Sequence, residues 1–159
     1  MLPDPLHPAV VHFPIALASF IPMLAILAIV AIRQKWLPER AWAAIVLVQA
    51  ILVGCAWLSS ETGEEEEDRV EKVVAHEIIH EHEEAAEAFL IAAAVALVAM
   101  GAGLLPERNG NLGRIAGAVL SIAVLGLGSN TGRLGGELVY EHGAASAYTA
   151  DAEEAAEGS

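Results

Sequence analysis

The residues with the clearest capacity for chemistry in this chain are its histidines, because a neutral imidazole can bind transition metals and haem iron. The sequence contains six of them: His7, His12, His76, His80, His82 and His142. All six lie outside four long apolar runs of the chain, and the topology predicted below places them all at one face of a membrane. This gathering indicates a cofactor or metal site at that face.

The segment His76-Glu-Ile-Ile-His80 matches the H-E-x-x-H pattern of zinc proteases, in which the histidines bind zinc and the glutamate is the general base. Glutamate and histidine are so common across residues 61–87 that such a match can arise by chance. On a helical projection both histidines also fall on the polar face. We therefore interpret the segment as a charged amphipathic extension of the third helix, with a peripheral metal-buffering site as the alternative. An electron carrier or a binding protein is favoured over a hydrolase.

Four runs with no charge, or almost none, dominate the rest of the chain. They cover residues 13–32, 41–60, 88–105 and 112–130. About twenty helical residues span the roughly 30 Å hydrocarbon core of a bilayer, and the chain is 55% hydrophobic with a mean hydropathy of +0.52. The sequence therefore predicts an all-α integral membrane protein with helices at about 13–32, 41–60, 70–105 and 112–130. We expect one domain over residues 1–143 and a mobile acidic tail over 144–159.

The net charge of −13 is concentrated outside the apolar runs, in residues 61–87, 137–141 and 151–157. No basic patch is present to neutralise phosphates, so nucleic-acid binding is not expected. The run Glu64-Glu-Glu-Glu-Asp68 is interpreted as a solvated helix start that the helix dipole favours. The alternative role for this run is docking of a basic partner such as a soluble cytochrome.

The basic residues predict the orientation of the chain in the membrane. Two short loops carry most of them: Arg33, Lys35, Arg40, Arg108 and Arg114. The positive-inside rule places these loops in the cytoplasm. Both termini and residues 61–87 then lie outside, which predicts a multi-pass protein of the bacterial inner membrane with its histidines at the periplasmic face.

The two halves of the sequence resemble each other. His12 is followed by Leu37-Pro-Glu-Arg40 and then Ser60-Glu-Thr62-Gly63, whereas His82 is followed by Leu105-Pro-Glu-Arg108 and then Ser129-Asn-Thr131-Gly132. From histidine to threonine the distance is 50 positions in the first half and 49 in the second. This repeat predicts two helical hairpins that cross the membrane in the same direction and pack as a four-helix bundle. It makes His12 and His82 equivalent positions.

These two histidines are expected to point into the bundle. A helix over residues 70–89 places His82 within an apolar stripe that includes Ile78 and Phe89. His12 begins the first apolar run, and the same reasoning applies to it. We therefore predict that the two imidazoles face each other as axial ligands of a haem b. The alternative is that each is a core histidine bonded to a backbone carbonyl.

Two further histidines are candidates for the same site. The paired glycines Gly135 and Gly136 permit a tight return of the chain over the bundle mouth, which would bring His142 to the site. His7 precedes His12 by five residues. We expect His7 and His142 to act as alternative ligands or as hydrogen-bond partners of the ligands.

Three stretches carry a resemblance to a known family. They are Leu6-His-Pro-Ala-Val-Val-His12-Phe-Pro-Ile-Ala-Leu17, His82-Glu83 and Gly135-Gly-Glu-Leu-Val-Tyr-Glu-His-Gly143. Over residues 6–143 the chain resembles the bacterial membrane family called domain of unknown function 2231. The resemblance implies a small four-helix membrane fold. Relatives joined to cytochrome c-like or Rieske-like modules imply an electron-transfer setting.

Three functions follow as hypotheses. The first is an electron-transfer protein that binds haem b through His12 and His82 and exchanges electrons with a periplasmic carrier or redox subunit. The second is a protein that binds or transports a single copper, zinc or iron ion through His12, His82, His142 and Glu83 or Glu61. The third is a structural membrane subunit without a cofactor. Each is compatible with a homo-oligomer in the lipid bilayer.

Overall fold

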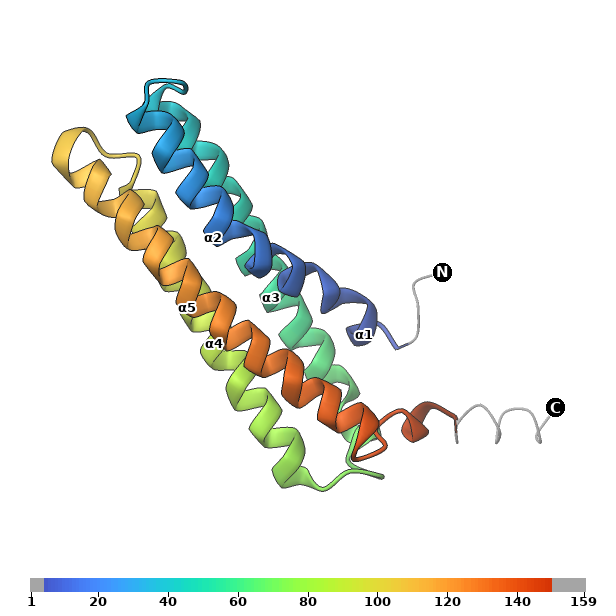
Figure 1. Ribbon diagram of the computed structural model, residues 1–159. Coiled ribbons are helices and arrows are strands. Elements are labelled where there is room, and N and C mark those ends of the chain that lie inside the picture. Colours follow the sequence, from blue (N-terminus) through green and yellow to red (C-terminus); the bar gives the residue numbers. More distant parts are fainter. Residues whose placement is uncertain (1–4, 150–159) are drawn as a thin grey trace.

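The computed structural model describes residues 5–149, and within them the chain forms helices and no strand. The helices are α1 (His7–Val10), α2 (His12–Arg33), the 3-10 helix η1 (Glu39–Ala41), α3 (Trp42–Val70), α4 (His76–Ala102) and α5 (Glu107–Tyr140). The four long helices run side by side as two hairpins, α2–α3 and α4–α5, that point the same way (Figure 1). Their short connections lie at one end, the loop end. Helix α1, the end of α5 and the α3–α4 turn lie at the other, the terminal end.

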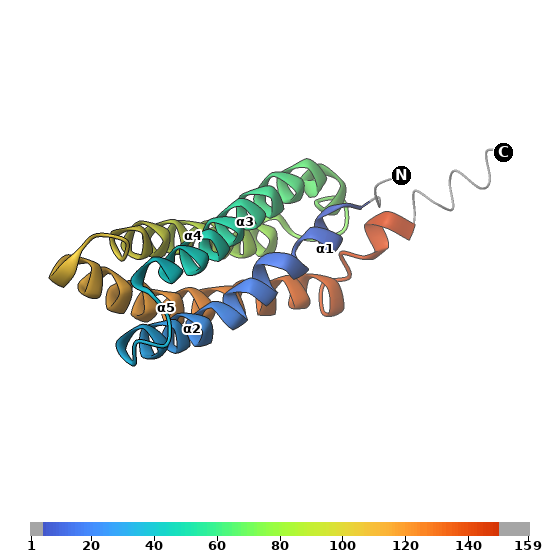
Figure 2. The same cartoon turned by 90° about the horizontal axis from the view of Figure 1, so that it is seen from above.

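The packing joins the two hairpins into one bundle. Each long helix packs against two others, α2 against α3 and α5, and α4 against α3 and α5. Figure 2 shows α3 and α4 in one layer and α2 and α5 in the other. The predicted all-α bundle of two hairpins is therefore confirmed.

The surface of the bundle is apolar over the middle of its length. All four long helices are long and apolar enough to cross a membrane. Large apolar side chains lie on the outside of the bundle, among them Phe20, Leu47 and Val98, which is 75% exposed. Water would disfavour such a surface, whereas lipid chains solvate it.

The bundle core is made mainly of small residues. Ala25, Ala93 and Ala96 are fully buried between the helices, together with Leu52 and Met100. Small side chains let helix backbones approach closely, which supplies dispersion contacts where no hydrophobic effect acts between lipid-embedded helices. The composition rich in alanine thus has a direct packing role.

A buried arginine joins the hairpins at the loop end. The Arg114 side chain is only 8% exposed. Its Nε donates to the Gly103 carbonyl at 2.9 Å, and a terminal nitrogen donates to the Glu39 carboxylate at 3.1 Å. Nearby, the Trp42 indole donates to the Met100 carbonyl at 2.8 Å. The bonds from Arg114 and Trp42 thus give the last carbonyls of α4 side-chain donors, beside the Gly103 N–H that already reaches Met100.

The helix boundaries differ from the predicted ones at the terminal end. Helix α3 continues ten residues past its expected end and stops at Val70, and α4 begins only at His76. The predicted helix over 70–105 is therefore broken by a turn before His76, where Ala75 is extended. The acidic run 64–68 lies in the last part of α3, so its interpretation as a helix start was wrong. Glutamate favours helix strongly enough to continue α3 there despite the unfavourable dipole.

The C-terminal region also differs from expectation. Helix α5 passes through Gly135 and Gly136 without a return and ends at Tyr140. The chain turns instead near Gly143, whose φ of +72° is the left-handed conformation that glycine adopts without strain. Beyond the turn, Ala144 is buried in a small second core with Val74 and Ile79. Residues 144–149, expected to be mobile, are thus packed; residues 150–159 of the predicted tail lie outside the described range.

Candidate functional site

Two histidines from different hairpins meet at the terminal end, and they are not the predicted pair. The rings of His7 and His82 have their centroids 6.4 Å apart and their planes at 88°. His12 is exposed on α2. The prediction that His12 faces His82 inside the bundle is therefore corrected: His7 takes its place.

The reason is the helical spacing of the two residues. The backbone stays right-handed helical at Val11, between α1 and α2, so five residues rotate the chain by about 140° and the two side chains face different directions. α1 packs against α3 as well as α2 and leans across α3 in Figure 1. His7 therefore lies beside α3, whereas His12, at the start of α2, is exposed.

Main-chain and hydroxyl oxygens of α3 orient the His7 ring. Its Nδ1 lies 2.8 Å from the Ser59 carbonyl and 3.4 Å from the Thr62 hydroxyl. Since a carbonyl oxygen only accepts hydrogen bonds, Nδ1 must carry the ring proton. The lone pair of the neutral imidazole is then on Nε2.

The His82 ring lies near α5. Its Nδ1 is buried and has no hydrogen-bond partner, and the main chain of Thr131 lies near the ring. A small shift that lets Nδ1 donate to the Thr131 carbonyl would give this nitrogen a partner.

Each ring also lies over a glycine of the neighbouring helix. A Cβ added at Gly63 would come within 3.2 Å of the His7 ring, and one at Gly135 within 3.1 Å of the His82 ring. An added methyl group at either position would therefore press on the ring, which would have to shift by a few tenths of an ångström. The two hairpins repeat one arrangement, in which a histidine of the first helix lies on a glycine of the second.

The other predicted site residues lie elsewhere. His142 is exposed beyond the end of α5, and Glu61 is exposed on α3. Glu83 is half-buried, but its carboxylate is directed to His80, 3.6 Å from Nδ1. Within residues 5–149 no hydrogen bond or ion pair joins His142 or Glu83 to either ring of the His7–His82 pair.

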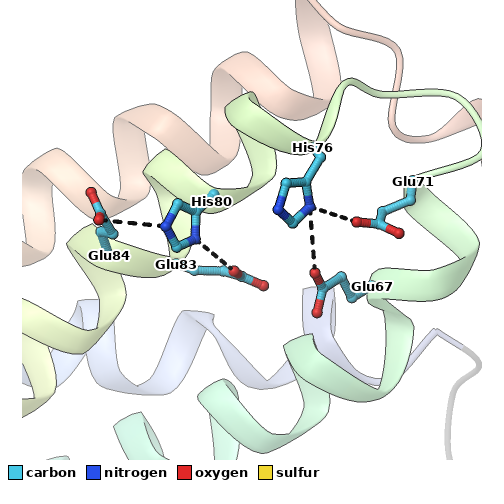
Figure 3. A network of polar contacts seen from close by, with 6 residues as sticks. All are labelled: Glu67, Glu71, His76, His80, Glu83 and Glu84. Atoms are coloured by element: carbon cyan, nitrogen blue, oxygen red, sulfur yellow. Dashed lines mark hydrogen bonds and ion pairs between the residues drawn. The ribbon is translucent and has the colours of Figure 1, made fainter.

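A second group of polar residues lies on the outside of the α3–α4 turn (Figure 3). The His76 and His80 rings stack with centroids 5.9 Å apart, and His76 Nδ1 lies 2.6 Å from the Glu71 carboxylate. Ligand atoms of Glu67, Glu71 and His76 lie within 4.8 Å of one another. The His76 side chain is 64% exposed and that of His80 58%. Both histidines of the H-E-x-x-H match therefore lie on the polar face, as predicted.

Two residues near the His7–His82 pair, which we call the inner pair, were not predicted from the sequence. Glu66 of α3 accepts hydrogen bonds from the backbone N–H groups of Leu6 and His7, at 2.9 and 3.2 Å. Its other oxygen accepts from the Tyr148 hydroxyl. The side chain of Leu6, the N-cap residue of α1, cannot accept a hydrogen bond, so a cap for α1 has to come from another part of the chain.

A bundle of four helices that could each cross a membrane is consistent with the family that the sequence suggested. A family model described as "Predicted membrane protein (DUF2231)" matches residues 3–147. The chain belongs to the DUF2231 family. The DUF2231 match includes all four long helices and both histidines of the pair. Comparison with curated proteins and with solved structures gives no match.

Proposed function

We propose that this DUF2231 protein is a b-type haem protein for electron transfer, with His7 and His82 as the axial ligands. The observation that supports this most is the relation of the two rings. Two metal–nitrogen bonds of about 2.0 Å on opposite sides of one ion would hold imidazole centres about 6 Å apart. The centroids of His7 and His82 are 6.4 Å apart.

The surroundings of the two rings support a ligand role. A ligating histidine usually donates its second ring N–H to a carbonyl, which fixes the ring and raises its basicity. The Ser59 carbonyl accepts such a bond from His7, which leaves Nε2 of His7 for a metal. The main chain of Thr131 lies near the His82 ring, whose Nδ1 has no other partner. Haem bound there would supply one-electron transfer.

The number of ligands favours haem over a single ion. Zinc sites need three or four protein ligands, and most copper sites need at least three. In residues 5–149, neither His7 nor His82 belongs to a group of three or more ligand side chains close enough to share an ion. Haem iron takes four nitrogens from its porphyrin and only one or two ligands from the protein.

The proposed setting is the periplasmic side of the bacterial inner membrane. The positive-inside rule places the loop end in the cytoplasm, because that end carries Arg33, Lys35 and Arg40. The terminal end instead presents exposed carboxylates such as Glu64, Glu65 and Asp68. A soluble electron carrier with a basic face would be attracted to this end.

An absorption spectrum of the protein, purified in detergent after haem-replete expression, tests the proposal. We expect a low-spin Soret band that His7→Ala and His82→Ala each abolish. The controls His12→Ala and His142→Ala should keep it. A wild-type protein without a chromophore would refute the haem proposal; stoichiometric copper, zinc or iron lost in the same two variants would point to a metal-ion protein. If the protein contains neither a chromophore nor a stoichiometric metal ion, a structural subunit is the remaining function.

A further inference from the structure

The helix that carries His7 is too short to be stable alone. α1 has four residues, and its N-cap residue Leu6 makes no side-chain hydrogen bond to it. Isolated helices of this length do not form in water, because nucleation is unfavourable. The position of His7 must therefore be held by contacts with the rest of the bundle.

The Glu66 carboxylate supplies the cap that α1 lacks. One oxygen accepts from the backbone N–H groups of both Leu6 and His7. The first N–H groups of a helix have no partner within it, and a carboxylate satisfies them with charge-assisted hydrogen bonds. Glu66 is half-buried, so solvent screens these bonds less than it would at an exposed site.

The second Glu66 oxygen is bound by the other end of the chain. The Tyr148 hydroxyl donates to it, and the Arg69 guanidinium lies 5.3 Å from the centre of the Tyr148 ring. The segment that carries Tyr148 is itself anchored, because Ala144 and Ala147 are buried and the Ala144 N–H donates to the Leu138 carbonyl. Residues 6–7 and Tyr148 thus meet at one side chain of α3.

We infer that Glu66 is a positioning residue that fixes α1 on α3, so that the His7 ring is held beside the His82 ring, with Tyr148 orienting the carboxylate. The neighbouring Ser59–His7 bond holds the ring, whereas Glu66 holds the backbone from which the ring projects. The consequence for a bound metal rests on the proposed haem function. The positioning of α1 does not.

Amide hydrogen exchange of the full chain in lipid nanodiscs, without added cofactor, tests the positioning. Glu66→Ala should speed exchange of the amides of residues 6–11 on the order of tenfold, because two charge-assisted hydrogen bonds are lost. Tyr148→Phe should have a smaller effect at the same amides. Glu66→Gln keeps an acceptor oxygen and should retain most of the protection. Glu65→Ala removes the same charge from the next, exposed position and should change nothing.

The same variants, loaded with haem, test the consequence. Glu66→Ala should convert part of the low-spin spectrum to high spin and shift the midpoint potential, whereas Glu65→Ala should match wild type. Equal exchange in Glu66→Ala and Glu65→Ala would overturn the positioning role, whatever cofactor binds. If wild type binds no haem but Glu66→Ala still loses protection, the haem proposal fails and the positioning role stands.

Discussion

The terminal end of this protein holds two pairs of histidines that differ in almost every physical respect. His7 and His82 come from different hairpins, and their rings are half-buried and perpendicular. His76 and His80 lie one turn apart on α4, with parallel rings that are mostly exposed. The inner pair is oriented through the main chain, whereas the outer pair is bonded to glutamates.

The difference shows which features give a histidine a defined role. The outer pair, His76 and His80, is surrounded by glutamates, but solvent reaches these groups. Each ion pair therefore contributes little to stability, and its geometry is loosely held. The inner pair is held by the backbone and by close contact with Gly63 and Gly135, which fixes the direction of the remaining lone pair. The pair that forms a recognisable sequence motif is thus the weaker candidate, and the pair separated by 75 residues is the stronger.

The largest expected effect comes from His82→Leu. In haem-loaded protein it should lower the unfolding free energy by about 3–4 kcal/mol, the stabilisation that a ligand at 100 to 1,000 times its Kd provides. In haem-free protein it should be neutral or stabilising by about 1 kcal/mol, because a buried nitrogen without a good partner is removed. Thermal unfolding with and without haem measures both. The matched His80→Leu should leave both values unchanged, and an equal effect of the two substitutions would remove the distinction between the pairs.

Sequence reasoning predicted the fold from features that act locally. Runs of about twenty apolar residues have one stable form in a membrane, the helix, and the short loops at Pro38 and Pro106 require neighbouring helices to be antiparallel. The end of α3 was not foreseen, because the acidic segment 61–70 has no apolar periodicity to show it is helical. The helix propensity of its residues makes this segment helical instead.

The candidate site was predicted in part. His82 was identified because an apolar stripe surrounds it, and this stripe survives the break before α4. The repeat indicated His12, since it aligns positions along the chain and does not show that His12 is exposed and that His7 lies beside His82. Glu66 was not identified, because its hydrogen bonds join residues about 60 and 82 positions apart.

A second prediction extends the comparison from histidines to arginines. Arg114→Ala should destabilise the protein by about 2–3 kcal/mol, because a buried side chain and its bonds to Gly103 and Glu39 are lost. Arg133, which is 54% exposed and paired with Glu137 on the same helix, is the matched control. Arg133→Ala should cost less than about 0.5 kcal/mol. Denaturation in detergent gives both values, and similar losses would mean that burial does not set the strength of polar contacts in this bundle.

A third prediction concerns two adjacent glycines of α5. A methyl at Gly135 would press on the His82 ring, whereas one at Gly136 would meet no atom within 4 Å. Gly135→Ala should therefore cost about 1–2 kcal/mol through overpacking and weaken haem retention. Gly136→Ala should stabilise α5 by up to about 1 kcal/mol, since alanine favours helix over glycine. If both substitutions stabilise, the ring does not rest on Gly135.

The smallest expected effect comes from the outer pair. The double variant His76→Ala, His80→Ala should change the unfolding free energy by less than about 0.5 kcal/mol, because both rings are exposed and their contacts with Glu71 and Glu83 compete with water. Whatever difference is present at low ionic strength should diminish in about 1 M salt, where the screening length is about 3 Å. The Soret band and the exchange rate of residues 6–11 should match wild type. A change in either would mean that the outer pair acts on the inner one through α4, the helix that carries His76, His80 and His82.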